Sequence, residues 1–138
     1  MADITITAAN VQPGSTVRTK QVTLGATVAA GQWVYLDTAA ADVAKLAQAD
    51  GTALEATVEG MALSDGATGQ LVLIAQSGSI VTVGSVLGKG DSYNLAATAG
   101  KMANEADLAT TQYLTQCGYG ISATSLQIAI NNTGVTHV

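Results

Sequence analysis

The sequence carries one plan twice, as Gly25-Ala-Thr-Val-Ala-Ala-Gly31-Gln-Trp-Val-Tyr35-Leu36 and again as Gly84-Ser-Val-Leu-Gly-Lys-Gly90-Asp-Ser-Tyr93-Asn-Leu95. In each stretch a second glycine follows the first after six residues, and a leucine ends the segment five residues later. Further along, Gly60-Met-Ala-Leu63-Ser64 is echoed by Gly118-Tyr-Gly-Ile121-Ser122. Because a fixed internal repeat is the signature of a duplicated structural unit, we expect one domain with internal pseudo-symmetry.

Short runs of alternating or β-branched residues recur along the chain, separated by glycine-rich turns. Strands at such spacings are typical of all-β folds. We therefore predict a compact β-sandwich or β-barrel of short antiparallel strands, with pseudo-repeats at about 25–75 and 84–130. Residues 70–75 are apolar on both sides and predict a central strand covered on both faces. Helical spacing competes at 51–59 and 105–110, so at most one or two short helices are expected.

The two ends of the chain are expected to differ from the single β domain at 15–131. Residues 1–14 predict an N-terminal arm, in which Asp3-Ile-Thr-Ile-Thr7 alternates and Pro13-Gly14 makes a turn. Such a strand either closes the protein's own sheet or adds to the edge of a partner's sheet. Residues 132–138 are polar and turn-rich, which predicts a flexible tail.

Composition limits the classes of partner. The net charge of −5 over 138 residues argues against binding to nucleic-acid phosphates, and no stretch approaches the roughly 18 apolar residues of a membrane span. Only 11% of residues are charged, which is low for a monomer in water. Self-association is therefore expected, with a trimer favoured and a dimer as the alternative. The aromatic residues Trp33, Tyr35, Tyr93, Tyr113 and Tyr119 are expected to be anchors in the core or in an interface.

Titratable residues are too few and too scattered to predict a catalytic site. His137 is one residue from the end of the sequence. Cys117 shares an apolar strand face with Tyr113, Tyr119 and Ile121, which indicates a small buried hydrophobe and not a reactive thiol. The acidic residues do not match the spacing of a calcium loop. We predict no enzymatic activity, no cofactor and no metal site.

Several segments together resemble the small capsid decoration proteins of tailed bacteriophages, which are also called cement, head-stabilising or head-fibre-like proteins. The resemblance runs over nearly the whole chain and rests on glycine and aliphatic patterning, at residues 1–7, 31–37, 60–64, 69–72 and 126–130. It implies a virion protein made in the bacterial cytoplasm and bound to the capsid exterior. Its partner would be a major capsid protein of the HK97-like fold, whose subunits it would bridge to stabilise the head against DNA pressure.

On this interpretation the N-terminal arm faces the capsid. Ile4, Thr5, Ile6, Thr7 and Val11 are the expected capsid-binding residues, with backbone hydrogen bonds supplied by strand addition. Deleting residues 2–12 would then abolish capsid binding and leave the fold intact. The alternative function is a β-sandwich module, displayed on a virion, that binds glycans of the host surface.

Overall fold

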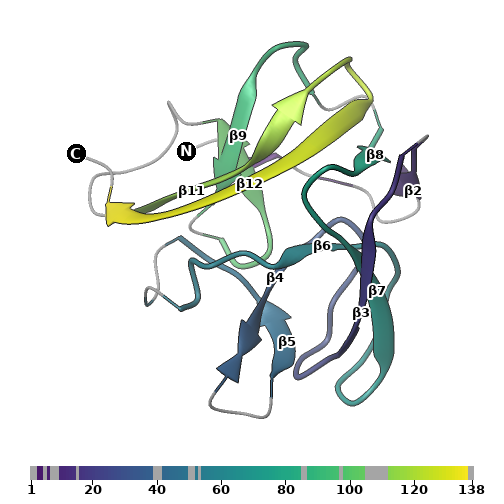
Figure 1. The fold of residues 1–138 in the computed structure, drawn as a ribbon, viewed down its shortest axis with the longest axis vertical. Coiled ribbons are helices and arrows are strands. Elements are labelled where there is room, and N and C mark those ends of the chain that lie inside the picture. The colour runs from purple at the N-terminus through teal and green to yellow at the C-terminus, as the bar shows by residue number, and fades with distance from the viewer. Residues whose placement is uncertain are drawn as a thin grey trace.

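The computed structural model describes residues 3–4, 6, 10–14, 16–38, 42–49, 52, 54–84, 87–96, 98–104 and 112–136. Within these ranges the chain forms two antiparallel β-sheets and no α-helix, so the all-β prediction is confirmed. Figure 1 shows the two sheets one above the other. None of these residues belongs to a helix long and apolar enough to cross a membrane.

The upper sheet in Figure 1 has seven strands and the lower sheet has five. The seven-stranded sheet has the order β1 (Asp3–Ile4), β10 (Met102–Asn104), β9 (Ser92–Leu95), β11 (Tyr113–Gly120), β12 (Ser125–Thr136), β8 (Ile80–Thr82) and β2 (Gln12–Pro13). The five-stranded sheet has the order β3 (Thr19–Thr23), β7 (Leu71–Ala75), β6 (Gly60–Ala62), β4 (Trp33–Asp37) and β5 (Val43–Leu46). This smaller sheet curls, because Leu24 at the end of β3 forms a parallel bridge with Ala44 in β5.

The two sheets contain the same five-stranded unit. The first unit has the order β3-β7-β6-β4-β5, and the second unit has the corresponding order β8-β12-β11-β9-β10. The turns correspond as well, because the Gly31 N–H donates to the Ala62 carbonyl at 2.8 Å and the Gly90 N–H donates to the Gly120 carbonyl at 2.7 Å. Gly31 and Gly90 have φ values of 91° and 84°, a region that glycine adopts without steric cost. The paired glycines of the sequence therefore lie at equivalent turns.

The two units pack against each other through opposite faces of their sheets. In the first unit Trp33, Met61 and Ala75 lie opposite one another on neighbouring strands, and all three are buried in the core cluster shared by the two sheets. The second unit contributes the opposite side of its own sheet to this cluster, including Tyr93 and Leu126. The outer face of the first unit thus covers the inner face of the second. A smaller cluster lies inside the curl of the first unit, formed by Val22, Leu24, Val28, Val34, Ala44, Ala62, Val72 and Ile74.

Gly60 and Gly118 occupy equivalent positions where two strands approach closely. A Cβ atom on Gly60 would lie 2.5 Å from the Ala75 carbonyl oxygen, and one on Gly118 would collide with the Gln127 carbonyl oxygen. We expect Gly60→Ala and Gly118→Ala each to lower the free energy of unfolding by about 1–3 kcal/mol, because the strands must move apart. Urea denaturation followed by circular dichroism measures this.

Gly69→Ala is the control for those two variants. Gly69 has a φ of 89° and no atom within 4 Å of an added Cβ, so it tests backbone strain without a collision. We expect it to cost about 1 kcal/mol. If Gly118→Ala unfolds at the same urea concentration as wild type, the close approach of β11 and β12 is not a constraint on the fold.

Strand β7 differs from its prediction. It was expected to be covered on both faces, but the side chains of Leu71 and Leu73 are 60% and 47% exposed. The second unit covers the outer face of the first only near Ala75 and Met61, and the part of β7 that bears the two leucines extends beyond this contact. Apolar residues on both sides of a strand therefore did not indicate burial on both sides.

Two further sequence predictions, the flexible tail at 132–138 and the short helices, can be compared with the structure. Residues 132–136, expected in a flexible tail, are part of β12, where Asn132 lies opposite Thr115 and Thr136 lies opposite Tyr113. Strand pairing uses backbone groups, so polar residues can form a β-ladder as apolar ones do. The polar composition of 132–136 therefore did not indicate a lack of strand structure. Within the expected helix at 51–59, residues 54–56 form a turn; the other expected helix, at 105–110, lies outside the described residues.

Candidate functional site

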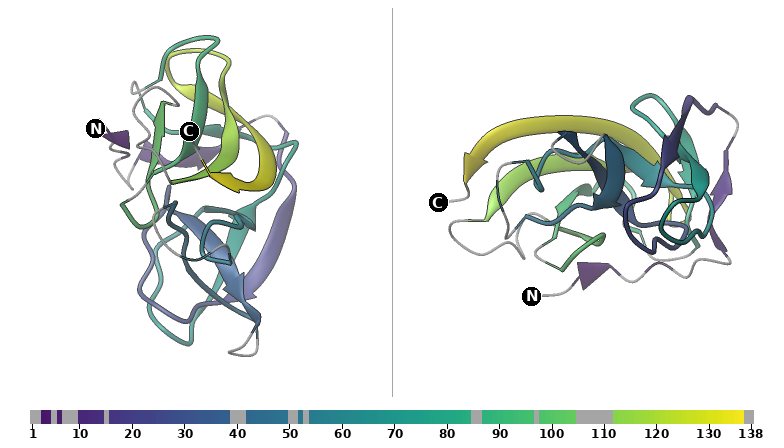
Figure 2. Two further views of the ribbon diagram at one scale, coloured as in Figure 1. Left: turned by 90° about the vertical axis from the view of Figure 1, so that its left-hand side faces the viewer. Right: turned by 90° about the horizontal axis from the view of Figure 1, so that it is seen from below.

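The N-terminal segment, described here at residues 3–4, 6 and 10–13, joins both edges of the seven-stranded sheet. In β1, Asp3 lies opposite Ala103 and Ile4 lies opposite Met102. In β2, at the other edge, Pro13 lies opposite Val81. In the right view of Figure 2, β1 lies beside the N-terminus and β2 lies at the right-hand end of the molecule. The segment therefore belongs to the protein's own sheet, which is one of the two alternatives that the sequence left open.

The side chains of this segment face the protein's own core. Val11 is buried in the cluster between the sheets, and Ile4 and Ile6 are half-buried against the same cluster. The expected binding of these three residues to a capsid stays a prediction, and it would require the segment to leave the core that it contacts here. Alternation revealed an apolar face but could not reveal which protein covers it. Thr5 and Thr7, the other two expected contact residues, lie outside the described residues.

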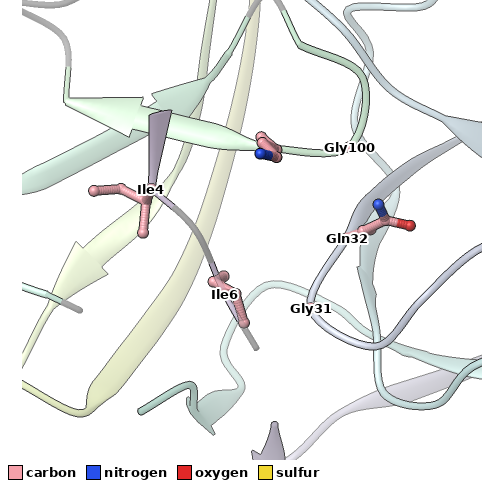
Figure 3. Close-up of a pocket in the computed structure, with 6 residues that line it drawn as sticks. Ile4, Ile6, Gly31, Gln32 and Gly100 are labelled. Carbon is pink, nitrogen blue, oxygen red and sulfur yellow. The ribbon is translucent and has the colours of Figure 1, made fainter. Parts of the chain in front are cut away.

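A small hollow lies between this segment and the loops of the two units. Figure 3 shows Ile4 and Ile6 on one side of it and Gly31, Gln32 and Gly100 on the other. Its volume is about 50 Å³, well below the roughly 300 Å³ or more of a small-molecule site. Gly31 permits the close approach, since a Cβ atom there would lie 2.7 Å from Cγ2 of Ile6. The hollow indicates an imperfectly filled contact and not a ligand pocket.

The five aromatic residues divide between the core and the surface. Trp33, Tyr35 and Tyr93 are buried in the cluster between the sheets, and Tyr113 is half-buried against it. Tyr119 is 41% exposed. A register shift in β11 between Gln116 and Gly118 explains its exposure, because such a bulge interrupts the alternation of side chains between the two faces. The predicted common face of Cys117 and Tyr119 is therefore wrong, and Tyr119 is the aromatic residue most available to a partner.

Reactive groups do not gather into a site within the described residues. No group of three metal-binding side chains is found among them. Cys117 is buried as predicted, and burial raises the pKa of its thiol, which disfavours the nucleophilic thiolate. Charged side chains form surface pairs, such as Lys45 with Asp37 at 2.9 Å and Lys20 with Glu59 at 3.6 Å. His137 lies outside the described residues.

An exposed apolar face lies on the outer side of the five-stranded sheet. We define this leucine face as Gln21, Thr23, Leu71 and Leu73, since Leu71 lies opposite Thr23 and Leu73 lies opposite Gln21. All four side chains are exposed and none carries a charge. Sequence reasoning missed this face because it interpreted both leucines as core residues; the polar alternation of Thr19, Gln21 and Thr23 in the partner strand was the available signal.

The second unit shows that the fold does not require a leucine at the position of Leu73. Ile74 lies opposite Ala62, and its equivalent Leu126 lies opposite Gly120. The Leu63 N–H donates to the Leu73 carbonyl and the Ile121 N–H donates to the Ser125 carbonyl, which places Ser125, the first residue of β12, at the position of Leu73. The same unit thus forms with a serine where the first unit exposes Leu73. The leucines are therefore candidates for a role in binding.

Neither a scan against protein-family models nor a search of curated proteins finds a match. The described residues offer a β-scaffold with dispersed charged pairs, and the leucine face is an exposed, uncharged and partly apolar surface on it. Such a surface can bind another protein without burying an unpaired charge.

Proposed function

We propose that the protein is a capsid decoration protein of a tailed bacteriophage. It binds the outer surface of the capsid through the leucine face and bridges subunits of an HK97-like major capsid protein, which stabilises the head against the pressure of packaged DNA. The exposure of Leu71 and Leu73 on a face that the fold does not need to be apolar is the observation that carries this proposal. The resemblance of the sequence to decoration proteins supports the choice of a capsid as the partner.

The size of the leucine face favours a repetitive partner. Burying the exposed parts of two leucine side chains contributes on the order of 2 kcal/mol, whereas a micromolar complex needs about 8 kcal/mol. A single contact of this size is therefore weak. Several weak contacts on one lattice gain effective concentration from one another, so a capsid that presents the same site many times converts them into stable binding.

The polar residues around the leucines suit a protein partner. Gln21 and Thr23 flank Leu73 and Leu71 across the strand pair and are exposed. Their side chains can exchange hydrogen bonds with water for hydrogen bonds with a partner, as at the polar rim of an interface. Since none of the four residues is charged, docking would not desolvate an unpaired ion.

The double variant Leu71→Ser/Leu73→Ser tests the leucine face directly. We expect its affinity for capsids to fall by about tenfold or more, because each 1.4 kcal/mol of lost contact is a factor of ten at a single site and the losses multiply over several sites. The free energy of unfolding should change little, since both leucine side chains are exposed and a serine occupies the position of Leu73 in the second unit. Co-sedimentation with purified capsids that lack the protein measures binding.

The control for this test is Ala123→Ser in the second unit, which changes an exposed side chain in the bend before β12, outside the leucine face. It should bind capsids as wild type does. If the double leucine variant decorates capsids to the wild-type level, another surface carries the interaction. Mass spectrometry of purified virions tests the function itself: an amount comparable with that of the major capsid protein supports decoration. A few copies per particle, or none, would reject it and favour the host-surface glycan module.

A further inference from the structure

The two units close the edge beside their outermost strand in different ways. In the first unit, the chain that continues from β3 covers β5, with Leu24 bridged to Ala44 and the Gly25 N–H donating to the Ala44 carbonyl at 2.7 Å. Met102 is the equivalent of Ala44, since Ala44 lies opposite Leu36 and Met102 lies opposite the corresponding Leu95. Ile4 in β1 lies opposite Met102. β1 therefore supplies to the second unit the cover that the first unit takes from its own β3.

The free edge of β10, which β1 pairs with, is formed by the strands of the second unit without β1. The strand order of the second unit, β8-β12-β11-β9-β10, matches that of the first unit without any contribution from β1. Met102, at the edge that β1 covers, is fully buried in the structure, so a strand at this edge shields an apolar side chain from water. β1 is also far from β10 in sequence, and nothing in the connectivity of the second unit requires β1 to come from the same chain.

β1 is held by a limited contact. Among the described residues, the pairing with β10 consists of Asp3 opposite Ala103 and Ile4 opposite Met102. The hollow of about 50 Å³ beside Ile4 and Ile6 shows that packing on this side is incomplete. Such a strand can leave and rebind while the two sheets remain formed, because the cores of both units are built chiefly from other strands.

We propose that β1 is exchanged between copies of the protein, so that the place beside β10 accepts the N-terminal strand of a second copy. A second copy is the occupant that fits, because it presents the same Asp3 and Ile4 and remakes every contact of the closed form. Exchange of an identical element is a low-cost route to an oligomer. Reciprocal exchange gives a closed dimer, and exchange in one direction around a ring gives a trimer.

Mixed single-cysteine chains distinguish exchange from closure within one chain. One chain carries Ile4→Cys and the other carries Met102→Cys, both with Cys117→Ala, and one of the two is labelled with nitrogen-15. Residues opposite each other on antiparallel strands have Cβ atoms about 4.5–5.5 Å apart, near enough for a disulfide after a small adjustment. The chains are unfolded, refolded together at high concentration and oxidised. Mass spectrometry then measures the disulfide-linked heterodimer.

We expect the heterodimer to exceed by about tenfold the amount formed by a control mixture of Ile4→Cys with Leu71→Cys chains, which meet only by collision. Asp3→Cys with Ala103→Cys is a second pair that avoids replacing buried Met102. Either pair giving this excess supports exchange. The proposal is overturned if neither pair exceeds the control while chains that carry both cysteines of a pair form their disulfide internally.

Discussion

Replacing Trp33 with alanine is expected to lower the free energy of unfolding by about 3–5 kcal/mol. This is a large share of the roughly 5–15 kcal/mol that stabilises a typical domain. Trp33 has no exposed surface and lies in the row with Met61 and Ala75, through which the first unit covers the second. Loss of the indole would leave a cavity between the two sheets, where neither backbone can collapse without breaking its own ladder.

Trp33→Phe is the matched variant, because it keeps most of the ring volume. The Nε1 atom of Trp33 has no hydrogen-bond partner among the described residues, so phenylalanine sacrifices no hydrogen bond to them. We expect it to cost less than about 1.5 kcal/mol. Both variants remove the tryptophan fluorescence, so urea denaturation is followed by circular dichroism. Equal destabilisation by alanine and phenylalanine would show that ring volume is not what Trp33 contributes.

Deleting residues 2–12 is expected to lower the free energy of unfolding by several kcal/mol, because fully burying one large aliphatic side chain contributes about 1.5–3 kcal/mol. The deletion removes Val11 from the core and Ile4 and Ile6 from its margin. It also uncovers Met102 at one edge of the sheet. This expectation reverses that of the sequence, which treated the segment as an arm that could be removed without loss of the fold.

The double variant Ile4→Ser/Ile6→Ser keeps the length of the segment and removes only its apolar side chains. It should be less destabilised than the deletion, because Val11 and β2 remain in place. Thermal unfolding of both variants measures the difference. A truncated protein with the wild-type melting temperature would show that the segment is an independent arm, and its undiminished binding to capsids would separate the segment from the proposed function.

The repeat in the sequence reported the architecture because its glycines are fixed by backbone geometry. Gly31 and Gly90 have positive φ, and Gly60 and Gly118 lie against a neighbouring carbonyl, so no other residue fits these positions equally well. Such constraints act locally and are visible along the chain. Strand alternation was similarly informative for Leu126 and Ile128, which are buried on one face of β12 as predicted.

What the sequence could not show was which side of each unit would be covered. Trp33 and Leu73 lie on the same outer side of the first unit, yet one is buried and the other exposed, because the second unit covers only part of that side. Tyr119 is on the surface because the register of β11 shifts between Gln116 and Gly118, and no pattern in the sequence predicts this shift. The candidate site was missed for the same reason: the exposure of Leu71 and Leu73 depends on where the second unit ends.

The pairing of β1 with β10 also sets an order of events during synthesis. β1 leaves the ribosome well before its partner β10, because a chain emerges from its N-terminal side first and β10 follows every strand of the first unit. The first unit, which has a core of its own, is complete much earlier. β1 of a nascent chain therefore has no partner strand within its own chain until β10 has emerged.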